Sequence, residues 1–276
     1  MTSIDPTRRV IEQQLAWAAR RGLAVDPQGR TAHLEDNLFR PLHANTRAEF
    51  ASGAGNELGS AGAPGDMQSL RSSSALVCNV FDYWRGRDLG SLTSACGADP
   101  RVSEVAFEVV FPTGLNGTPP HLDVMLAGPG ALPTAIESKF TEIYAPHRDD
   151  FSDSYFRDPI LWEGLPACRQ LAEELRDRAT IFMHLGAAQL LKHALGLERA
   201  FGHRGYRLLL LWYEVEGREA QALRDEIELL RDRVSGDVRF DARTYQELFA
   251  QLRPYLERHG QYRAYLEQRY FPLDVL

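Results

Sequence analysis

The sequence lacks several features that would place a protein in a narrow class. No apolar run approaches the roughly 20 residues that a membrane-spanning helix needs, and the first residues, MTSIDPTRRVIEQQ, contain no hydrophobic segment of the signal-peptide type. The three cysteines, Cys78, Cys96 and Cys168, are too few and too widely spaced for a disulfide framework or a CxxC metal site. We therefore expect a cytoplasmic protein with no membrane partner.

Positive charge is also scarce for a protein that would bind a polyanion. Lysine and arginine total 31 against 38 aspartate and glutamate residues, which gives a formal net charge of −7. A polyanion would therefore need a local basic patch or a bound cation on the protein. The other bulk properties, 276 residues of which 44% are hydrophobic and 25% charged, suit one large buried core.

Local patterns predict an alternation of helices and strands. Asp5 and Pro6 are typical of a helix start, and five glycines among residues 51–66 predict a loop. The predicted strands are 102–111, 122–127, 134–141, 205–217 and 238–242, and the predicted helices are 6–21, 68–84, 161–178, 181–197, 218–234 and 244–270. The short connections require the first three strands to form a largely antiparallel meander.

This order of elements predicts an α/β three-layer domain, in which a mixed sheet is flanked by helices. We expect a single domain over residues 1–276. Its parts would be an N-terminal helix and glycine-rich loop (1–66), a core (67–240) and a C-terminal helical extension (241–276).

The most informative stretch is PPHLDVMLAGPGALPTAIESKF, residues 119–140. Side chains alternate along a strand, so Glu137 and Lys139 share one face and their Cβ atoms lie roughly 7 Å apart, while Ile136 and Phe140 share the other. A solvent-exposed face with a weak ion pair is the commoner explanation for Glu137 and Lys139 taken alone. The turn that joins the two strands can also bring Asp123 beside Glu137, and this convergence favours a functional site.

Two carboxylates that converge repel each other, and a hard divalent cation such as Mg²⁺ compensates that repulsion through oxygen ligands. A cation held in this way can polarise a phosphoryl oxygen and lower the pKa of a bound water. The lysine can neutralise charge that develops on the phosphate or orient the attacking water. These residue types therefore suit the hydrolysis of phosphodiester bonds.

The same residues resemble a known signature. Pro120, His121 and Asp123, a spacer of 13 residues, and then Glu137-Ser138-Lys139 resemble the PD-(D/E)XK motif of the restriction-endonuclease-like nuclease superfamily. In the fuller motif the proline directly precedes the aspartate, whereas here His121 and Leu122 stand between them. The predicted order of elements resembles that superfamily's αβββαβ core. GAGNEL (53–58), MQSLRSSSALVCNVF (67–81) and ESKFTE (137–142) resemble an uncharacterised branch of it.

The resemblance implies roles for the motif residues. Asp123 and Glu137 would be metal ligands, the backbone carbonyl of Ser138 a further ligand, and Lys139 the stabiliser of the transition state. The ion would be Mg²⁺, with Mn²⁺ as an alternative. The substrate would be DNA, with RNA left open.

Several further residues are candidates on the same resemblance. Many members supply another acid from the first core helix or just before it, for which Glu57 is the candidate and Glu108 the substitute. Some branches use a glutamine and a basic or aromatic residue on the helix after the motif, which Gln189 matches, with Lys192 or His193 about one turn on. His121, beside Asp123, could contact substrate, although a histidine in a turn is more often incidental.

Two functions of different classes follow. One is a Mg²⁺-dependent nuclease. The other is a catalytically inactive protein that keeps the nuclease fold as a nucleic-acid or protein-binding module. Retention of Asp123, Glu137 and Lys139 together favours the nuclease, because a binding module has no physical need for two carboxylates near a phosphate backbone. The acidic balance of the chain favours the module slightly.

Overall fold

A five-stranded mixed sheet organises the part of the chain that the structure describes. The computed structural model describes residues 5–53, 55–60, 62–115, 117, 119–146 and 150–272. The strands are β1 (Glu104–Val110), β2 (His121–Ala127), β3 (Thr134–Lys139), β4 (Arg207–Trp212) and β5 (Arg239–Thr244), and they lie side by side in that order. β1, β2 and β3 pair antiparallel, whereas β3, β4 and β5 pair parallel. The predicted antiparallel meander is confirmed.

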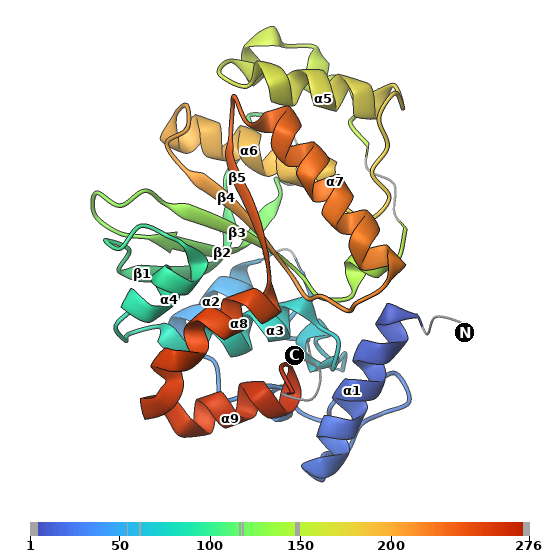
Figure 1. Cartoon of the computed structure of the whole chain (residues 1–276), viewed down its shortest axis with the longest axis vertical. Helices are drawn as coiled ribbons and strands as arrows, with labels where there is room; N and C mark the ends of the chain where they lie inside the picture. Colours follow the sequence, from blue (N-terminus) through green and yellow to red (C-terminus); the bar gives the residue numbers. More distant parts are fainter. Residues whose placement is uncertain are drawn as a thin grey trace.

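Helices cover both faces of this sheet, so that the fold has three layers (Figure 1). One layer contains α5 (Pro166–Arg176), α6 (Ala187–Phe201) and α7 (Arg218–Val234), which bury their apolar residues against one face. The other contains α1 (Pro6–Arg20), α2 (Ala44–Ser52), α3 (Ser73–Phe81), α4 (Gly90–Cys96), α8 (Tyr245–Leu252) and α9 (Gly260–Arg269). The predicted α/β fold with a mixed sheet between two helical layers is confirmed.

Short 3-10 helices occupy many of the connections in the described chain. They are η1 (Leu34–Asn37), η2 (Asp66–Gln68), η3 (Asp82–Trp84), η4 (Glu142–Tyr144), η5 (Asp153–Phe156), η6 (Pro159–Trp162) and η7 (Arg253–His259). The helix predicted from residue 161 begins instead at Pro166, because η6 comes first and proline favours the first helical turn. The helix predicted over 68–84 is likewise shortened to α3, whose start is capped by the Ser72 hydroxyl accepting from the Ala75 N–H.

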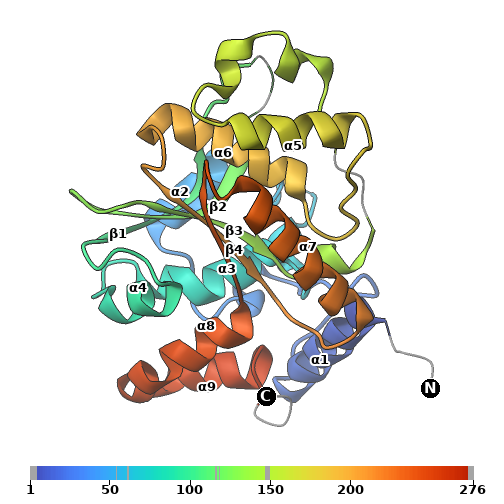
Figure 2. The same ribbon diagram turned by 45° about the horizontal axis from the view of Figure 1, so that its top comes forward.

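The two ends of the described chain lie together. Helices α1 and α9 are side by side in both views (Figures 1 and 2). The Gln14 amide donates to the carbonyl of Arg269 at 3.0 Å, and the Arg269 guanidinium donates to the Gln14 oxygen at 2.9 Å. Both side chains are fully buried, so these bonds replace the water that each polar group loses. The segments predicted as an N-terminal helix and a C-terminal extension therefore share one helical layer.

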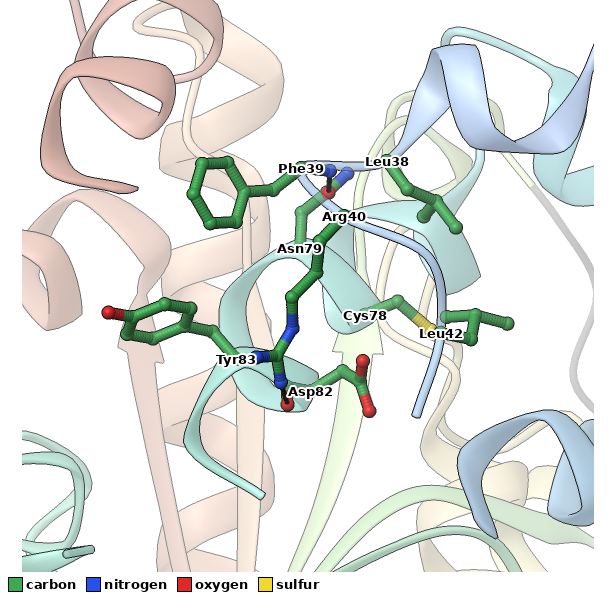
Figure 3. A pocket seen from close by; sticks show the side chains of 8 residues that line it. All are labelled: Leu38, Phe39, Arg40, Leu42, Cys78, Asn79, Asp82 and Tyr83. Atoms are coloured by element: carbon green, nitrogen blue, oxygen red, sulfur yellow. Dashed lines mark hydrogen bonds between the residues drawn. The ribbon is translucent and has the colours of Figure 1, made fainter. Parts of the chain in front are cut away.

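The segment between η1 and α2 is fastened to α3 and η3 (Figure 3). The backbone N–H of Phe39 donates to the Asn79 side chain at 2.7 Å, and the Arg40 guanidinium donates to the carbonyl of Asp82 at 2.6 Å. The same guanidinium lies 5.3 Å from the centre of the Tyr83 ring, a favourable cation–π distance. Because α3 packs on β2 and β3, these contacts help to fix the layer beneath the centre of the sheet.

No helix in the described ranges is both long enough and apolar enough to cross a membrane. The division of the chain into residues 1–66, 67–240 and 241–276 of one domain stays a prediction.

Candidate active site

Glu137 and Lys139 lie on central strand β3, on the face that helix α6 covers. Glu137 is 2% exposed, and the side chain of Lys139 is 20% exposed. Ile136 and Phe140 are buried against the opposite helical layer, which confirms the predicted alternation. The interpretation of Glu137 and Lys139 as a solvent-exposed strand face is wrong, because β3 has a strand on each side and a helical layer over each face.

The side chains of Glu137 and Lys139 form a small polar cluster with helix α6. The Lys139 ammonium lies 2.7 Å from Oε1 of Glu137 and donates to Oε1 of Gln189 at 2.9 Å. Nε2 of His193 lies 3.0 Å from Oε2 of Glu137. Gln189 and His193 are four residues apart and therefore share one face of the helix. Of the candidates on this helix, Gln189 and His193 reach the motif residues, whereas the Lys192 ammonium donates to the backbone carbonyl of Asp150 at 3.2 Å.

Asp123 is placed beside Glu137 by the register of β2 and β3. The regular pairing of these strands ends at Val124 and Ile136, so Asp123 stands opposite Glu137 one step further along. Beyond that point the Asp123 side chain takes the place of a backbone carbonyl on β2, because its Oδ2 accepts a hydrogen bond from the N–H of Ser138 at 2.7 Å. The sequence-predicted residues Asp123, Glu137 and Lys139 are thus brought together.

Strand β1 contributes a third carboxylate. Glu108, Asp123 and Glu137 stand side by side across β1, β2 and β3 and form a row of carboxylates. Glu108 faces Asp123 across β1 and β2, because the flanking pairs are Phe107 with Val124 and Val109 with Leu122. Glu108 itself has φ of 52°, a left-handed backbone conformation that is strained for a residue other than glycine. Its carboxylate lies 3.1 Å from Nδ1 of His121.

Side-chain alternation reverses in both strands at this row. Phe107 belongs to the core beneath the sheet on the α3 side, yet Val109, two residues on, packs on the α6 side. Leu122 and Val124 show the same change of face on either side of Asp123. Residues two apart in a regular strand point to the same face, so both strands twist locally at Glu108 and Asp123.

The three carboxylates have different affinities for protons. Burial and then the charge of Glu137 raise the pKa of Asp123 well above its ordinary value. Burial and the same charge raise the pKa of Glu108 to about 7. Burial alone would raise the pKa of Glu137, but the Lys139 ammonium and then the contact with His193 lower it. A divalent cation would relieve the repulsion that raises the pKa values of Asp123 and Glu108.

Glu57 lies in the loop between α2 and η2, as predicted. Burial and the charge of Glu108 raise the pKa of Glu57, although a hydrogen bond with Ser74 opposes this. Glu57 lines a cleft of about 400 Å³ together with Thr141, which follows β3 directly. Glu57 and Glu108 therefore both lie near the row, and both stay candidates for the additional acid.

Two contacts of this region were not anticipated from the sequence. The hydroxyls of Ser138 and Tyr245 share a hydrogen bond of 2.6 Å on the face opposite to Glu137. His121 is held by Glu108, although a histidine beside a turn is more often incidental. The sequence did hold a signal for His121, because residues two apart on a strand, such as His121 and Asp123, are expected on the same face. It held no signal for the strained backbone conformation of Glu108.

The backbone of β3 presents one more oxygen to the row. The carbonyl of Lys139 accepts from the N–H of Tyr213, the residue that follows β4, whereas the N–H of the preceding residue, Ser138, points toward β2. The N–H and C=O of one strand residue point to the same side, so the Ser138 carbonyl also faces β2 and Asp123. Within the described residues, no three histidine, cysteine, aspartate or glutamate side chains are grouped to hold a metal ion. The carboxylates of Asp123 and Glu137 and the carbonyl of Ser138 offer oxygens that could serve an ion, and Mg²⁺ with several waters suits such ligands.

Comparison with known proteins identifies a family for this chain. No curated protein and no solved structure matches this chain. A protein-family model described as "Restriction Endonuclease associating with ARP" matches residues 12–271, which is nearly the whole sequence. The chain therefore belongs to this family of restriction endonucleases.

Proposed function

We propose that the protein is a divalent-cation-dependent nuclease of the PD-(D/E)XK type that hydrolyses phosphodiester bonds in DNA. Membership of a restriction-endonuclease family suggests a nuclease. The observation that carries the finer proposal is the meeting of Asp123 with Glu137 where the pairing of β2 and β3 stops, beside the Lys139 ammonium. DNA is proposed as the substrate because restriction endonucleases cut DNA, and RNA stays the alternative.

Asp123, Glu137 and the carbonyl of Ser138 would hold the cation, which is Mg²⁺ or its substitute Mn²⁺. Once bound, such a cation supplies a Lewis acid for the phosphoryl oxygen and lowers the pKa of a coordinated water. Asp123 suits this role, because its oxygen is anchored by the Ser138 N–H, and because burial and the charge of Glu137 raise its pKa, an effect that a bound cation would oppose. The Lys139 ammonium forms an ion pair with Glu137 and lowers its pKa, so Glu137 is an ionised carboxylate in the free protein.

Lys139 would stabilise negative charge on the transferring phosphate. Burial alone would lower the pKa of its ammonium, but Glu137 and Asp123 raise it, so Lys139 is a cation at neutral pH. It therefore cannot act as a general base, and its role is electrostatic. The hydrogen bond to Gln189 fixes the ammonium at the end of β3, so its orientation is set before substrate arrives.

Glu57 or Glu108 would supply the additional acid. Glu108 has the stronger claim by position, because it stands in the same row as Asp123. Glu57 has the stronger claim by access, because it lines the neighbouring cleft. Replacing each with glutamine and measuring cleavage separates them, since only the acid that contacts the ion or its water should slow the reaction by about tenfold or more.

The alternative, a catalytically inactive binding module, predicts no cleavage under any condition. The direct test is incubation of plasmid, linear DNA and RNA with the protein in Mg²⁺, in Mn²⁺ and in EDTA. We expect cleavage of DNA that requires the cation. Absence of cleavage of every substrate in both cations would contradict the proposal.

The variant Lys139→Gln tests the role of the lysine in cleavage. Glutamine keeps a hydrogen-bond donor beside the buried Glu137 carboxylate, whereas alanine would leave that charge without a partner and destabilise the fold. We expect a fall in the cleavage rate of about 10²-fold or more with unchanged thermal unfolding to within a few degrees. A variant that cleaves as fast as the parent would remove Lys139 from the mechanism.

A further inference from the structure

Two polar atoms in the interior of the site lack hydrogen bonds. Oε2 of Glu137 and Nε2 of His193 are buried, and neither has a hydrogen-bond partner among the described residues. Each residue is 2% exposed. The atoms lie 3.0 Å apart, but the pair does not have the alignment of a hydrogen bond. Most buried polar atoms in proteins are hydrogen-bonded, so two adjacent exceptions call for a physical explanation.

The other polar atoms of the cluster are accounted for. Oε1 of Glu137 contacts the Lys139 ammonium at 2.7 Å, and that ammonium donates to Gln189 at 2.9 Å. The opposite face of β3 is closed by the hydrogen bond between the hydroxyls of Ser138 and Tyr245. The two atoms without a hydrogen bond are therefore Oε2 of Glu137 on β3 and Nε2 of His193 on α6, and they face each other.

The separation of these atoms fits a pair of metal ligands. Two ligand atoms that are each about 2.1 Å from an octahedral ion, and at a right angle to one another, lie about 3.0 Å apart. We propose that Oε2 of Glu137 and Nε2 of His193 are adjacent ligands of the divalent ion at this site, which makes His193 a metal ligand beyond the sequence motif. The inference rests on the proposed function, because it takes Glu137 as a ligand.

A nitrogen ligand changes the expected choice of metal. Mg²⁺ prefers oxygen ligands, whereas an imidazole nitrogen suits transition-metal ions. With His193 in the ligand set, the site takes Mn²⁺ in preference to Mg²⁺. His193 lies on helix α6, which packs on the sheet, so its ring is positioned by a rigid element and not by a loop.

The test is pulsed electron paramagnetic resonance of the purified protein loaded with Mn²⁺. An imidazole nitrogen bound to the ion gives ¹⁴N modulation of the electron spin echo. We expect this modulation in the parent, and we expect it to change when the protein is labelled with ¹⁵N-histidine. The labelled parent needs no substitution, so the result does not depend on whether a variant folds.

Two histidine variants assign the signal. We expect His193→Asn to lose the nitrogen modulation and to bind Mn²⁺ about tenfold or more weakly in calorimetric titrations. His121→Asn is the matched control, because His121 contacts Glu108 in the same row and should leave the modulation unchanged. Modulation lost in His121→Asn and kept in His193→Asn would overturn the assignment.

The outcomes separate this inference from the proposed function. A parent that binds Mn²⁺ and cleaves DNA without nitrogen modulation would overturn the ligand role of His193 and leave the nuclease proposal standing. A parent that binds no divalent ion would contradict both.

Discussion

The two halves of the sheet differ in regularity, and the candidate site lies where they meet. In the parallel half, β3 pairs with β4 and β4 with β5 over six consecutive residues each. In the antiparallel half, the pairing fails at Glu108 in β1 and at Asp123 in β2, and the side chains change face there. The regular half positions Glu137 and Lys139, while the irregular half turns further carboxylates toward them. Local strain and broken pairing of this kind cluster at functional sites.

The largest effect is expected from an uncharged replacement in the irregular half. Asp123→Asn keeps an oxygen that can accept from the Ser138 N–H but removes a negative charge beside Glu137. We expect cleavage of DNA to fall by about 10³-fold or more, measured as single-turnover rates at saturating Mg²⁺ or Mn²⁺.

The matched control for that variant lies in the regular half. Asp241 on β5 pairs with Arg207 on β4 at 2.5 Å, away from the row of carboxylates. Asp241→Asn should therefore leave the cleavage rate within about twofold, because the ion pairs that Asp241 makes with Arg207, Arg231 and Arg243 are partly exposed and contain no residue of the site. Equal losses of activity in the two variants would show that the two halves do not differ in function.

A smaller effect is expected in the pH dependence of stability through Glu108. The pKa of this carboxyl is about 7 in the folded protein against an ordinary value of 4.5. The stabilisation given by its neutral form is therefore complete below pH 4.5 and is lost as the pH rises through 7. Between pH 5 and pH 8 in EDTA, the free energy of unfolding should fall by about 2 kcal/mol more in the parent than in Glu108→Gln.

Denaturant titrations across that pH range provide the measurement. The same comparison on a His121→Asn background removes the imidazole that contacts Glu108 and so isolates the carboxyl. Parallel pH profiles for the parent and Glu108→Gln would mean that the row does not hold Glu108 as a neutral acid.

The smallest effect is expected on the face of β3 that carries no catalytic group. Tyr245→Phe leaves the buried Ser138 hydroxyl without its partner and should lower the free energy of unfolding by about 1–3 kcal/mol. Cleavage should stay within about twofold of the parent, because the hydroxyl pair lies opposite to Glu137. Loss of cleavage with unchanged stability would instead place Tyr245 in the reaction.

Much of the scaffold could be predicted from local sequence. Helix 218–234 was predicted with the bounds that the structure has, because charged and apolar residues alternate there at helical spacing. The meander followed from short connections that leave no room for a crossover. Helices α2 and α4 were missed, since both are short and α2 has little amphipathic pattern.

The site was predictable only in part. Glu137 and Lys139 follow from strand alternation, but their burial under α6 depends on packing between segments far apart in the sequence. The sequence VAFEVVF suggests uninterrupted alternation, so the change of face at Glu108 has no local signal. The contact of His193 with Glu137 depends in the same way on where α6 crosses the sheet.

Calorimetric titration of Mg²⁺ and Mn²⁺ into the parent, Asp123→Asn and Glu137→Gln proteins tests the central claim most directly. The convergence of these two carboxylates predicts that the parent binds one ion and that each variant binds it at least about tenfold more weakly. Equal binding by all three proteins, or binding by none, would contradict it.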